Sequence, residues 1–278
     1  MWYAIVGESG QPEALCPSNP RANKSHIRER LDRIRRTIMD FTHILPFLST
    51  GLTLLFTGAV FSRYFKRHHR PHLLLWGIGL ALYAVGTFAE AYLAVRWNPL
   101  LLRLWYLSGA MLTAAWLGQG TVYLLMRRPG LAHTLMALVG IASVMALVGV
   151  FTAPLEASAF QLGVPLSSQY KDILTRSGLM ILLTILLNIY GTVGLIGGAL
   201  WSAYLFWRKQ VLPNRVVGNL FIAVGAFFPA SAGTFIKLGL GDWLYLSELI
   251  GAALMFVGFW LATQPQPVDK PVTTALAA

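Results

Sequence analysis

Residues 131–151, which read LAHTLMALVGIASVMALVGVF, contain no Asp, Glu, Lys or Arg over 21 consecutive positions. One α-helix needs about 20 mostly apolar residues to cross the hydrocarbon layer of a membrane. A membrane-spanning β-strand would instead show about 10 residues of alternating polarity, and this stretch does not alternate. The stretch therefore predicts a transmembrane helix, and the rest of the chain can be interpreted from it.

Six further segments share this length and apolar character. Short turns that contain Pro, Gly or Asn separate most of them, and these residues commonly interrupt helices. One longer internal loop, 152–177, follows the fourth segment. The sequence therefore predicts an all-α polytopic membrane protein, a bundle of seven transmembrane helices. The expected spans are 43–64, 73–95, 101–126, 131–151, 178–207, 216–238 and 244–263.

The composition excludes several other classes of protein. Of the 278 residues, 56% are hydrophobic and 12% are charged, whereas about 25% are charged in an ordinary soluble domain. The mean hydropathy is +0.59. These values exclude a soluble globular domain and a disordered chain. The single cysteine, Cys16, excludes an internal disulfide and a cysteine-based metal cluster.

The distribution of basic residues predicts the orientation of the bundle. The loops after the first, third and fifth expected spans and the tail together hold ten Lys and Arg residues, against five at the opposite ends. Because Lys and Arg are enriched on the cytoplasmic side, the C-terminus is expected in the cytoplasm of a cell-membrane protein. The net charge of +11 then indicates loops that face anionic lipid headgroups. Nucleic acid is not an expected partner, because these bases are spread over several short loops.

The first 38 residues disturb this orientation, because they add seven bases to the side predicted to lie outside. Two interpretations remain open. Ile27, Leu31, Ile34 and Ile38 line one face of a basic amphipathic surface helix, or the chain starts at Met39 rather than Met1. The expected organisation is a basic N-terminal extension over 1–38, a transmembrane domain over 39–263 and a short cytoplasmic tail over 264–278.

Two acidic residues, Glu90 and Glu248, lie well within expected spans, and two basic residues, Arg103 and Lys237, lie near span ends. The direction of each span places all four in the outer half of the membrane. Ionisable residues at such depth are costly and are candidates for a functional site. The four side chains are therefore expected to line a ligand-binding cavity or to form a charge network. The alternatives are a purely structural ion-pair network, or snorkelling of the two bases to the headgroups.

Polar and aromatic residues near these positions extend the candidate site. Trp105 and Tyr106 lie at the outer membrane boundary, and Asn188 and Tyr190 lie near the middle of the fifth span. All four are candidates for lining a pocket. Pro229 lies within the sixth span, where it removes a backbone hydrogen bond and is expected to kink the helix as a hinge.

Gly194 and Gly198 form a GxxxG pattern in the fifth span. Small residues at this spacing allow two helices to approach closely. The pattern therefore predicts a helix contact within the chain, or a face for a second copy or another protein partner.

No catalytic arrangement is evident in the spans, and we expect neither catalytic residues nor a metal site. The run 67–72, RHHRPH, offers histidines as metal ligands, but it contains no carboxylate or cysteine, and its arginines repel a cation. This run is therefore predicted to be a basic cytoplasmic loop. The sequence indicates no particular cofactor.

These observations favour a non-catalytic membrane protein that binds a small or amphiphilic ligand in an outward-facing cavity. The architecture alone resembles receptor and sensor bundles of seven helices. An accessory subunit of a larger membrane complex is a related prediction. A secondary transporter is the first alternative, although Pro229 is the sole interior break in the expected spans, and such folds usually contain broken helices. A membrane enzyme without a recognisable motif is the second alternative.

Overall fold

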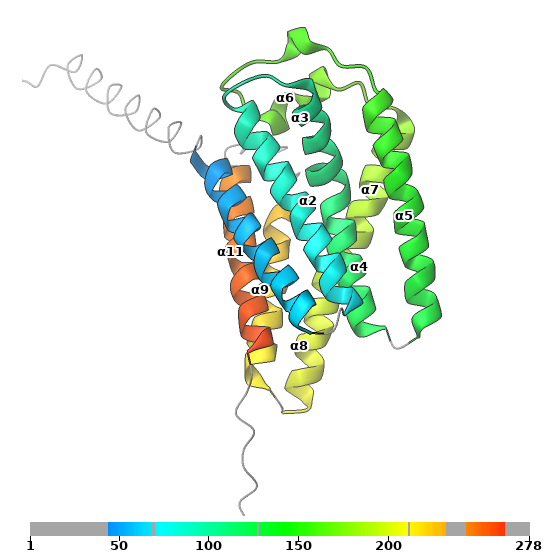
Figure 1. Ribbon diagram of the computed structural model, residues 1–278, viewed down its shortest axis with the longest axis vertical. Helices are drawn as coiled ribbons and strands as arrows, with labels where there is room; N and C mark the ends of the chain where they lie inside the picture. The colour runs from blue at the N-terminus through cyan, green and yellow to red at the C-terminus, as the bar shows by residue number, and fades with distance from the viewer. Residues whose placement is uncertain (1–43, 68–69, 127, 211, 232–242, 265–278) are drawn as a thin grey trace, which may run out of the picture. The chain divides into compact units, whose positions relative to one another are not determined.

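The structure is a computed structural model that describes residues 44–67, 70–126, 128–210, 212–231 and 243–264. These residues form helices joined by short connections, and among them the only β-type pairing is an isolated bridge between Leu155 and Leu174. The prediction of an all-α membrane bundle is thus confirmed (Figure 1). The N-terminal extension, the question of the start residue and nearly all of the tail lie outside the described residues.

Six helices in the described part of the chain are long and apolar enough to cross a membrane, where the sequence predicted seven. The helix that corresponds to the expected span 216–238 is α9 (Pro213–Ala230), which is not among the six, and the described residues stop just beyond it at Ser231. The six spans are Ile44–Lys66, Pro71–Leu93, Pro99–Leu125, Gly130–Thr152, Gly178–Arg208 and Leu244–Thr263.

Two of the spans are not regular α-helices along their whole length. The third span consists of α3 (Pro99–Leu104), the π-helical segment η1 (Trp105–Leu112) and α4 (Thr113–Leu125). The fifth consists of α7 (Gly178–Thr192), the π-helical segment η3 (Val193–Gly197) and α8 (Gly198–Arg208). The other long helices are α2 (Pro71–Leu93), α5 (Pro129–Thr152), α9 and α11 (Trp243–Thr263).

Local sequence explains where these helices begin. Proline occupies the first turn of α2, α3, α5 and α9, where its missing N–H costs no helical hydrogen bond. The Asn98 side chain accepts hydrogen bonds from the backbone N–H groups at the start of α3, and Ser177 does the same for α7. The sequence thus sets the start of α2, α3, α5, α7 and α9 by residues that suit a helix N-terminus.

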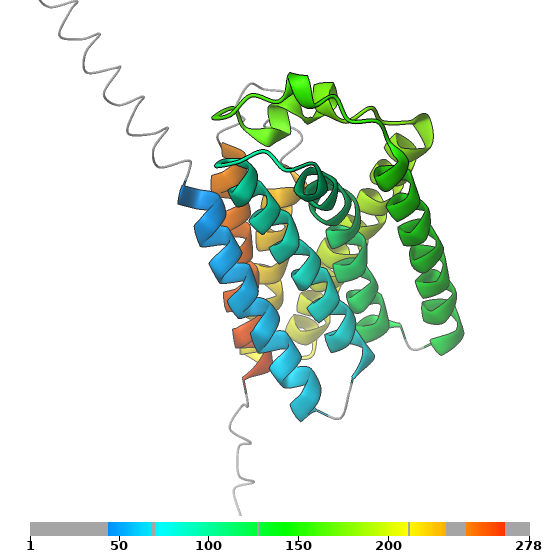
Figure 2. The ribbon, with the colours of Figure 1, turned by 45° about the horizontal axis from the view of Figure 1, so that its top comes forward.

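Helix packing divides the bundle into two neighbouring groups that share α2 and α4. Helix α2 lies against η1 and α4, and α4 lies against α7 and η3, while α9 packs most extensively on α11 and also on α8. Helix α5 stands at the edge of the bundle and contacts mainly α4, α7 and η1 (Figures 1 and 2). The α9–α11 contact depends on small residues, because a Cβ on Gly251 would lie 2.7 Å from the carbonyl oxygen of Gly225.

The crossing of α4 with α7 and η3 also depends on glycine. A Cβ on Gly118 would lie 2.8 Å from the Cα of Gly191, and one on Gly194 would lie 3.1 Å from the Cα of Gly118. Gly198 faces Thr121 of α4 in the same way. The Gly194 and Gly198 face is therefore in contact with α4 of the same chain, which is the first of the two roles expected for it, a helix contact within the chain.

The connection 153–177 has an ordered structure rather than being a simple loop. Its two ends pair through the backbone, since the Glu156 N–H donates to Ile173 and the Thr175 N–H donates to Pro154. The Gln169 side chain binds the backbone of Gln161 and Val164 and so holds the middle of the connection together. The connection includes η2 (Ala157–Ala159) and α6 (Leu166–Ile173), and it lies across one end of the bundle, here called the α6 end (Figure 2).

The two ends of the bundle differ in charge. The end opposite α6, here called the basic end, carries eight Lys and Arg residues and no acid among the described residues. The α6 end carries four described bases, Arg96, Arg103, Lys171 and Arg176, together with the acids Glu156 and Asp172. The bases of the basic end are Arg63, Lys66, Arg67, Arg70, Arg128, Arg208, Lys209 and Arg215.

Candidate ligand-binding cavity

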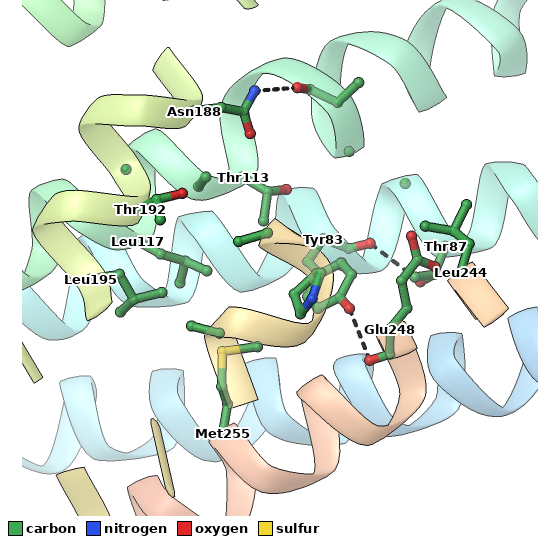
Figure 3. Close-up of a pocket in the computed structure, with 18 of the residues that line it drawn as sticks. Tyr83, Thr87, Thr113, Leu117, Asn188, Thr192, Leu195, Leu244, Glu248 and Met255 are labelled. Carbon is green, nitrogen blue, oxygen red and sulfur yellow. Dashed lines mark hydrogen bonds between the residues drawn. The ribbon is translucent and has the colours of Figure 1, made fainter. Parts of the chain in front are cut away.

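A cavity of about 380 Å³ lies among the helices in the half of the bundle nearer the α6 end. Its wall is formed by α2, η1, α4, α6, α7, η3, α9 and α11 (Figure 3). Most of the lining is apolar, with Leu117, Leu195 and Met255 away from the polar groups described below. This size and mixture of surfaces are typical of sites that bind small organic molecules.

Two glutamates provide the charged part of the cavity. Glu90 lies in the last turn of α2 and is 3% exposed, while Glu248 lies near the start of α11. Their carboxyl groups are within hydrogen-bonding reach of each other, and the indole of Trp105 is next to the Glu90 carboxyl group. Glu248 extends from α11 toward Thr87 of α2 (Figure 3). Two helices distant in sequence thus bring two acids to one point.

Unpartnered polar atoms concentrate at this cavity. Among the described residues, four buried side-chain oxygens lack a hydrogen-bond partner: Ser49 Oγ, Glu90 Oε1, Ser167 Oγ and Glu248 Oε2. Three of the four belong to residues that line the cavity. A buried polar atom without a partner is costly, and native proteins retain few of them. The residues of the cavity wall therefore hold most of the buried side-chain oxygens that lack a partner in the described part of the chain.

Aromatic side chains surround the carboxyl pair. The Tyr83 hydroxyl donates a 3.0 Å hydrogen bond to the main-chain oxygen of Glu248, which ties α2 to α11 (Figure 3). The ring centroid of Tyr170, from α6, lies 5.6 Å from that of Trp105 and 5.8 Å from that of Tyr106. Tyr83, Trp105 and Tyr170 all line the cavity. The α6 connection thus closes the aromatic wall at its own end.

Tyr170 is held neutral by its surroundings. Burial raises the pKa of its phenol above the ordinary value, while the nearby positive charge of Arg176 opposes this effect. The Arg176 guanidinium carbon lies 5.0 Å from the centre of the Tyr170 ring. Tyr170 therefore contributes a hydroxyl and an aromatic face, rather than a negative charge, at physiological pH.

Three irregularities of the helices meet at the cavity. Segment η1 contributes Trp105, Gly109 and Ala110, and η3 contributes Leu195 and Ile196. Pro229, inside α9, contributes the third. π-Helical segments are rare and often occur at functional sites. The cavity thus lies where three of the helices depart from regular α-helical geometry.

Side chains stabilise the π-helical segment η1. The Asn188 amide donates hydrogen bonds of 2.7 Å to the Ala110 carbonyl and 2.8 Å to the Thr184 carbonyl. Within the third span, the Thr113 hydroxyl donates to the Ser108 carbonyl at 2.8 Å. Backbone groups inside a membrane need such partners wherever the helix is irregular. Asn188 thus holds α7 to η1 at the cavity wall.

The structure places the expected pocket residues in two different environments. Trp105, Asn188 and Pro229 line the cavity together with Glu90 and Glu248. Tyr106 and Tyr190 do not line it. The Tyr106 hydroxyl lies 3.2 Å from the Thr184 hydroxyl, and the Tyr190 hydroxyl donates to Gln119. These two tyrosines therefore connect helices beside the cavity.

Arg103 does not join the glutamates. Its guanidinium donates hydrogen bonds to the carbonyls of Val150 and, at 2.9 Å, of Ala153, at the C-terminal end of α5. A cation in this position satisfies carbonyls that lack helical partners and interacts favourably with the helix dipole. Among the described residues, Glu90 and Glu248 thus lie together without Arg103. Lys237 lies outside the described residues.

Some lining residues were not predicted from the sequence. Tyr83, Gly86 and Thr87 precede Glu90 by seven, four and three positions, which is the spacing of one helical face. That spacing was therefore a usable signal. Ser167 and Tyr170 had no such signal, because they lie in the connection, whose fold over the α6 end is not evident from its sequence.

The electrostatics of the cavity favour a positive or hydrogen-donating partner. The described lining contains two glutamates and no Lys, Arg or His. The described residues also contain no group of three or more His, Cys, Asp or Glu side chains that could hold a metal ion. The charged side chains in the described lining are thus all acidic.

Comparison of the chain with models of protein families, with curated proteins and with solved structures found no match. The function is therefore argued from the cavity itself.

Proposed function

We propose that this membrane protein binds a small or amphiphilic ligand, without catalysing a reaction, in the cavity at the α6 end. The observation that carries the proposal is the concentration of unpartnered oxygens from Glu90, Ser167 and Glu248 on one cavity of about 380 Å³. A ligand that satisfies these atoms would remove a cost that the folded bundle otherwise bears. The apolar remainder of the wall would bury the body of the same ligand.

The charge of the two ends supports an orientation for this site. The basic end holds eight of the bases in the described spans and turns, and the α6 end holds four. By the preference of Lys and Arg for the cytoplasmic side, the basic end and the C-terminus lie in the cytoplasm. The cavity then lies in the outer half of a cell membrane, within reach of ligands from outside or from the outer leaflet.

The test is ligand-dependent stabilisation of the purified protein in detergent. A ligand that binds only the folded state at 100 times its Kd raises the unfolding free energy by about 2.7 kcal/mol. We expect compounds from a small-molecule and amphiphile library to raise the Tm of the wild type.

Two adjacent substitutions localise the effect. Thr192→Trp fills part of the cavity, and Val193→Trp places the same side chain on an outward-facing position that is 68% exposed. Stabilisation should be lost in Thr192→Trp and kept in Val193→Trp. Equal stabilisation of both variants would show that the compounds bind elsewhere and would contradict the proposal.

A secondary transporter is the second candidate, and the helical irregularities favour it. The sequence showed Pro229 as a single interior break, but η1 and η3 add two more at the same cavity. Irregular helices around a central site are common in transporters. Uptake of a bound compound into proteoliposomes, driven by a proton gradient, would replace the binding-only function with transport.

The accessory-subunit prediction has less support. It depended on the Gly194 and Gly198 face, and α4 covers this face within the chain. Helix α9 likewise packs on α11 within the chain, since Gly225 lies against Gly251. A partner would therefore have to use another surface of the bundle.

A further inference from the structure

We propose that the ligand is an amphiphilic organic cation whose positively charged nitrogen binds between Glu90 and Glu248 in place of a proton. This inference rests on the proposed ligand-binding function and names the chemistry of the ligand. It is carried by the juxtaposition of two carboxyl groups in a cavity whose described lining contains no basic residue.

Two carboxylates within hydrogen-bonding reach and out of water cannot both be ionised without a positive charge beside them. In the empty cavity the pair therefore shares a proton, and each residue retains an unpartnered oxygen, Glu90 Oε1 and Glu248 Oε2. A bound ammonium group supplies the missing charge and several N–H donors at once. Both carboxylates can then be ionised.

The aromatic residues Tyr83, Trp105 and Tyr170 line the same cavity as the carboxyl pair, and aromatic faces attract organic cations. Leu117, Leu195 and Met255 line a part of the cavity that has room for an apolar group. A volume of about 380 Å³ far exceeds that of a single ion. The wall therefore matches a molecule with one cationic end and one apolar end.

No other described charge competes for this role. The titratable groups that line the cavity with the two glutamates are the hydroxyls of Tyr83, on α2, and Tyr170, on α6. The described lining from α7, η3, α9 and η1 contains no titratable side chain. Arg103 is bound to the end of α5, and Arg176 lies over the Tyr170 ring. Among the described groups, protonation at this site is thus governed by the carboxyl pair.

Binding then follows a balanced exchange. An ammonium ion enters, the proton shared by Glu90 and Glu248 leaves to the solvent, and no covalent bond to carbon changes. One proton is released for each cation bound. By mass action, Kd should fall by up to tenfold for each unit rise in pH while the shared proton is present.

The experiment uses three compounds of matched shape: 2-phenylethylamine as the cation, 2-phenylethanol as the neutral analogue and 3-phenylpropionate as the anion. Calorimetric titration in buffers of different protonation enthalpy measures both Kd and the number of protons released. We expect the amine alone to bind, with release of about one proton and a slope of log Kd against pH near minus one.

Three variants of the full chain test the residues. In Glu90→Gln and Glu248→Gln a single carboxylate remains to face the ammonium group, so the amine should bind more weakly than to the wild type. Glu156→Gln is the matched control, because Glu156 is an exposed acid of the α6 connection outside the cavity wall, and it should behave as the wild type. If either amide variant fails to fold, Glu248→Asp is tested in its place. This variant should still release a proton on binding the amine, and it should bind the amine more weakly than the wild type does.

The outcomes separate this inference from the proposed function. One outcome is that the alcohol or the acid binds at least as tightly as the amine and that Thr192→Trp abolishes this binding. This outcome would overturn the inference that the ligand is a cation, and it would leave the ligand-binding function standing. Binding of the amine without proton release would also overturn the inference. Failure of all three compounds, and of the broader library, to bind would overturn both.

Discussion

Replacement of Gly118 by alanine tests the helix crossing that shapes the cavity. A Cβ at this position would lie 2.8 Å from both the Cα and the carbonyl oxygen of Gly191, whereas ordinary contact begins at 3.4 Å. Both neighbouring atoms belong to the backbone, so no side-chain rotation can relieve the overlap. Helices α4 and α7 must therefore separate locally by 3.4 − 2.8 Å, or about 0.6 Å.

The expected cost follows from that displacement. Inserting a methyl group into a closely packed core commonly destabilises a protein by about 1–3 kcal/mol. The matched control is Gly140→Ala in α5, where an added Cβ meets no atom within 4 Å. There, replacing glycine within a helix should stabilise by as much as about 1 kcal/mol. The two substitutions should therefore differ by roughly 1–4 kcal/mol, with Gly118→Ala the less stable.

Reversible unfolding in mixed micelles measures this difference, and circular dichroism confirms that both variants remain helical before unfolding. Because Gly191 also lines the cavity, Gly118→Ala should in addition weaken any ligand-dependent rise in Tm. Unfolding free energies for the two variants that agree within about 0.5 kcal/mol would refute the inferred contact between α4 and α7.

Three further predictions concern individual side chains around the cavity. Arg103→Met should lower the unfolding free energy in mixed micelles by about 1–3 kcal/mol, because it removes the hydrogen bonds to the end of α5. It should leave ligand affinity unchanged. The control Arg96→Met, at an exposed position, should change the unfolding free energy little. Asn188→Leu should destabilise by a similar amount, because it frees two carbonyls, and hydrogen exchange in η1 should increase. Burial raises the pKa of Tyr170, so the folded protein favours the neutral phenol. The unfolding free energy should therefore fall as the pH rises above about 10, the pKa of tyrosine in the unfolded chain. Tyr170→Phe should reduce that fall. A pH profile identical in the wild type and the Phe variant would contradict this assignment.

Hydropathy was sufficient to predict most of the architecture. Continuous apolar runs located the six spans found among the described residues, because crossing a membrane imposes a length on each helix. The π-helical segments were not predictable in this way. Their residues, such as Trp105–Leu112, are as apolar as those of the neighbouring α-helical turns, and the irregularity arises from packing and from side chains such as Asn188.

The candidate site was predicted only in part, for a related reason. Counting residues along each span gives depth, and it placed Glu90 and Glu248 at the same level. Lateral position depends on which helices are neighbours, and hydropathy does not determine that. Arg103 illustrates the difference: at the correct depth for the glutamates, it binds instead to carbonyls of α5. Ser167 and Tyr170 required the fold of the connection to be known.

The π-helical segment η1 makes the length of the third span matter independently of its composition. An α-helix turns by about 100° per residue, so deleting a single residue within Trp105–Leu112 would rotate one half of the span against the other by that angle. Trp105 could then face the cavity only if Gly118 turned away from Gly191. Natural variants that keep Trp105 at the cavity wall and Gly118 against Gly191 must therefore preserve the spacing between these two residues, even where the intervening side chains change.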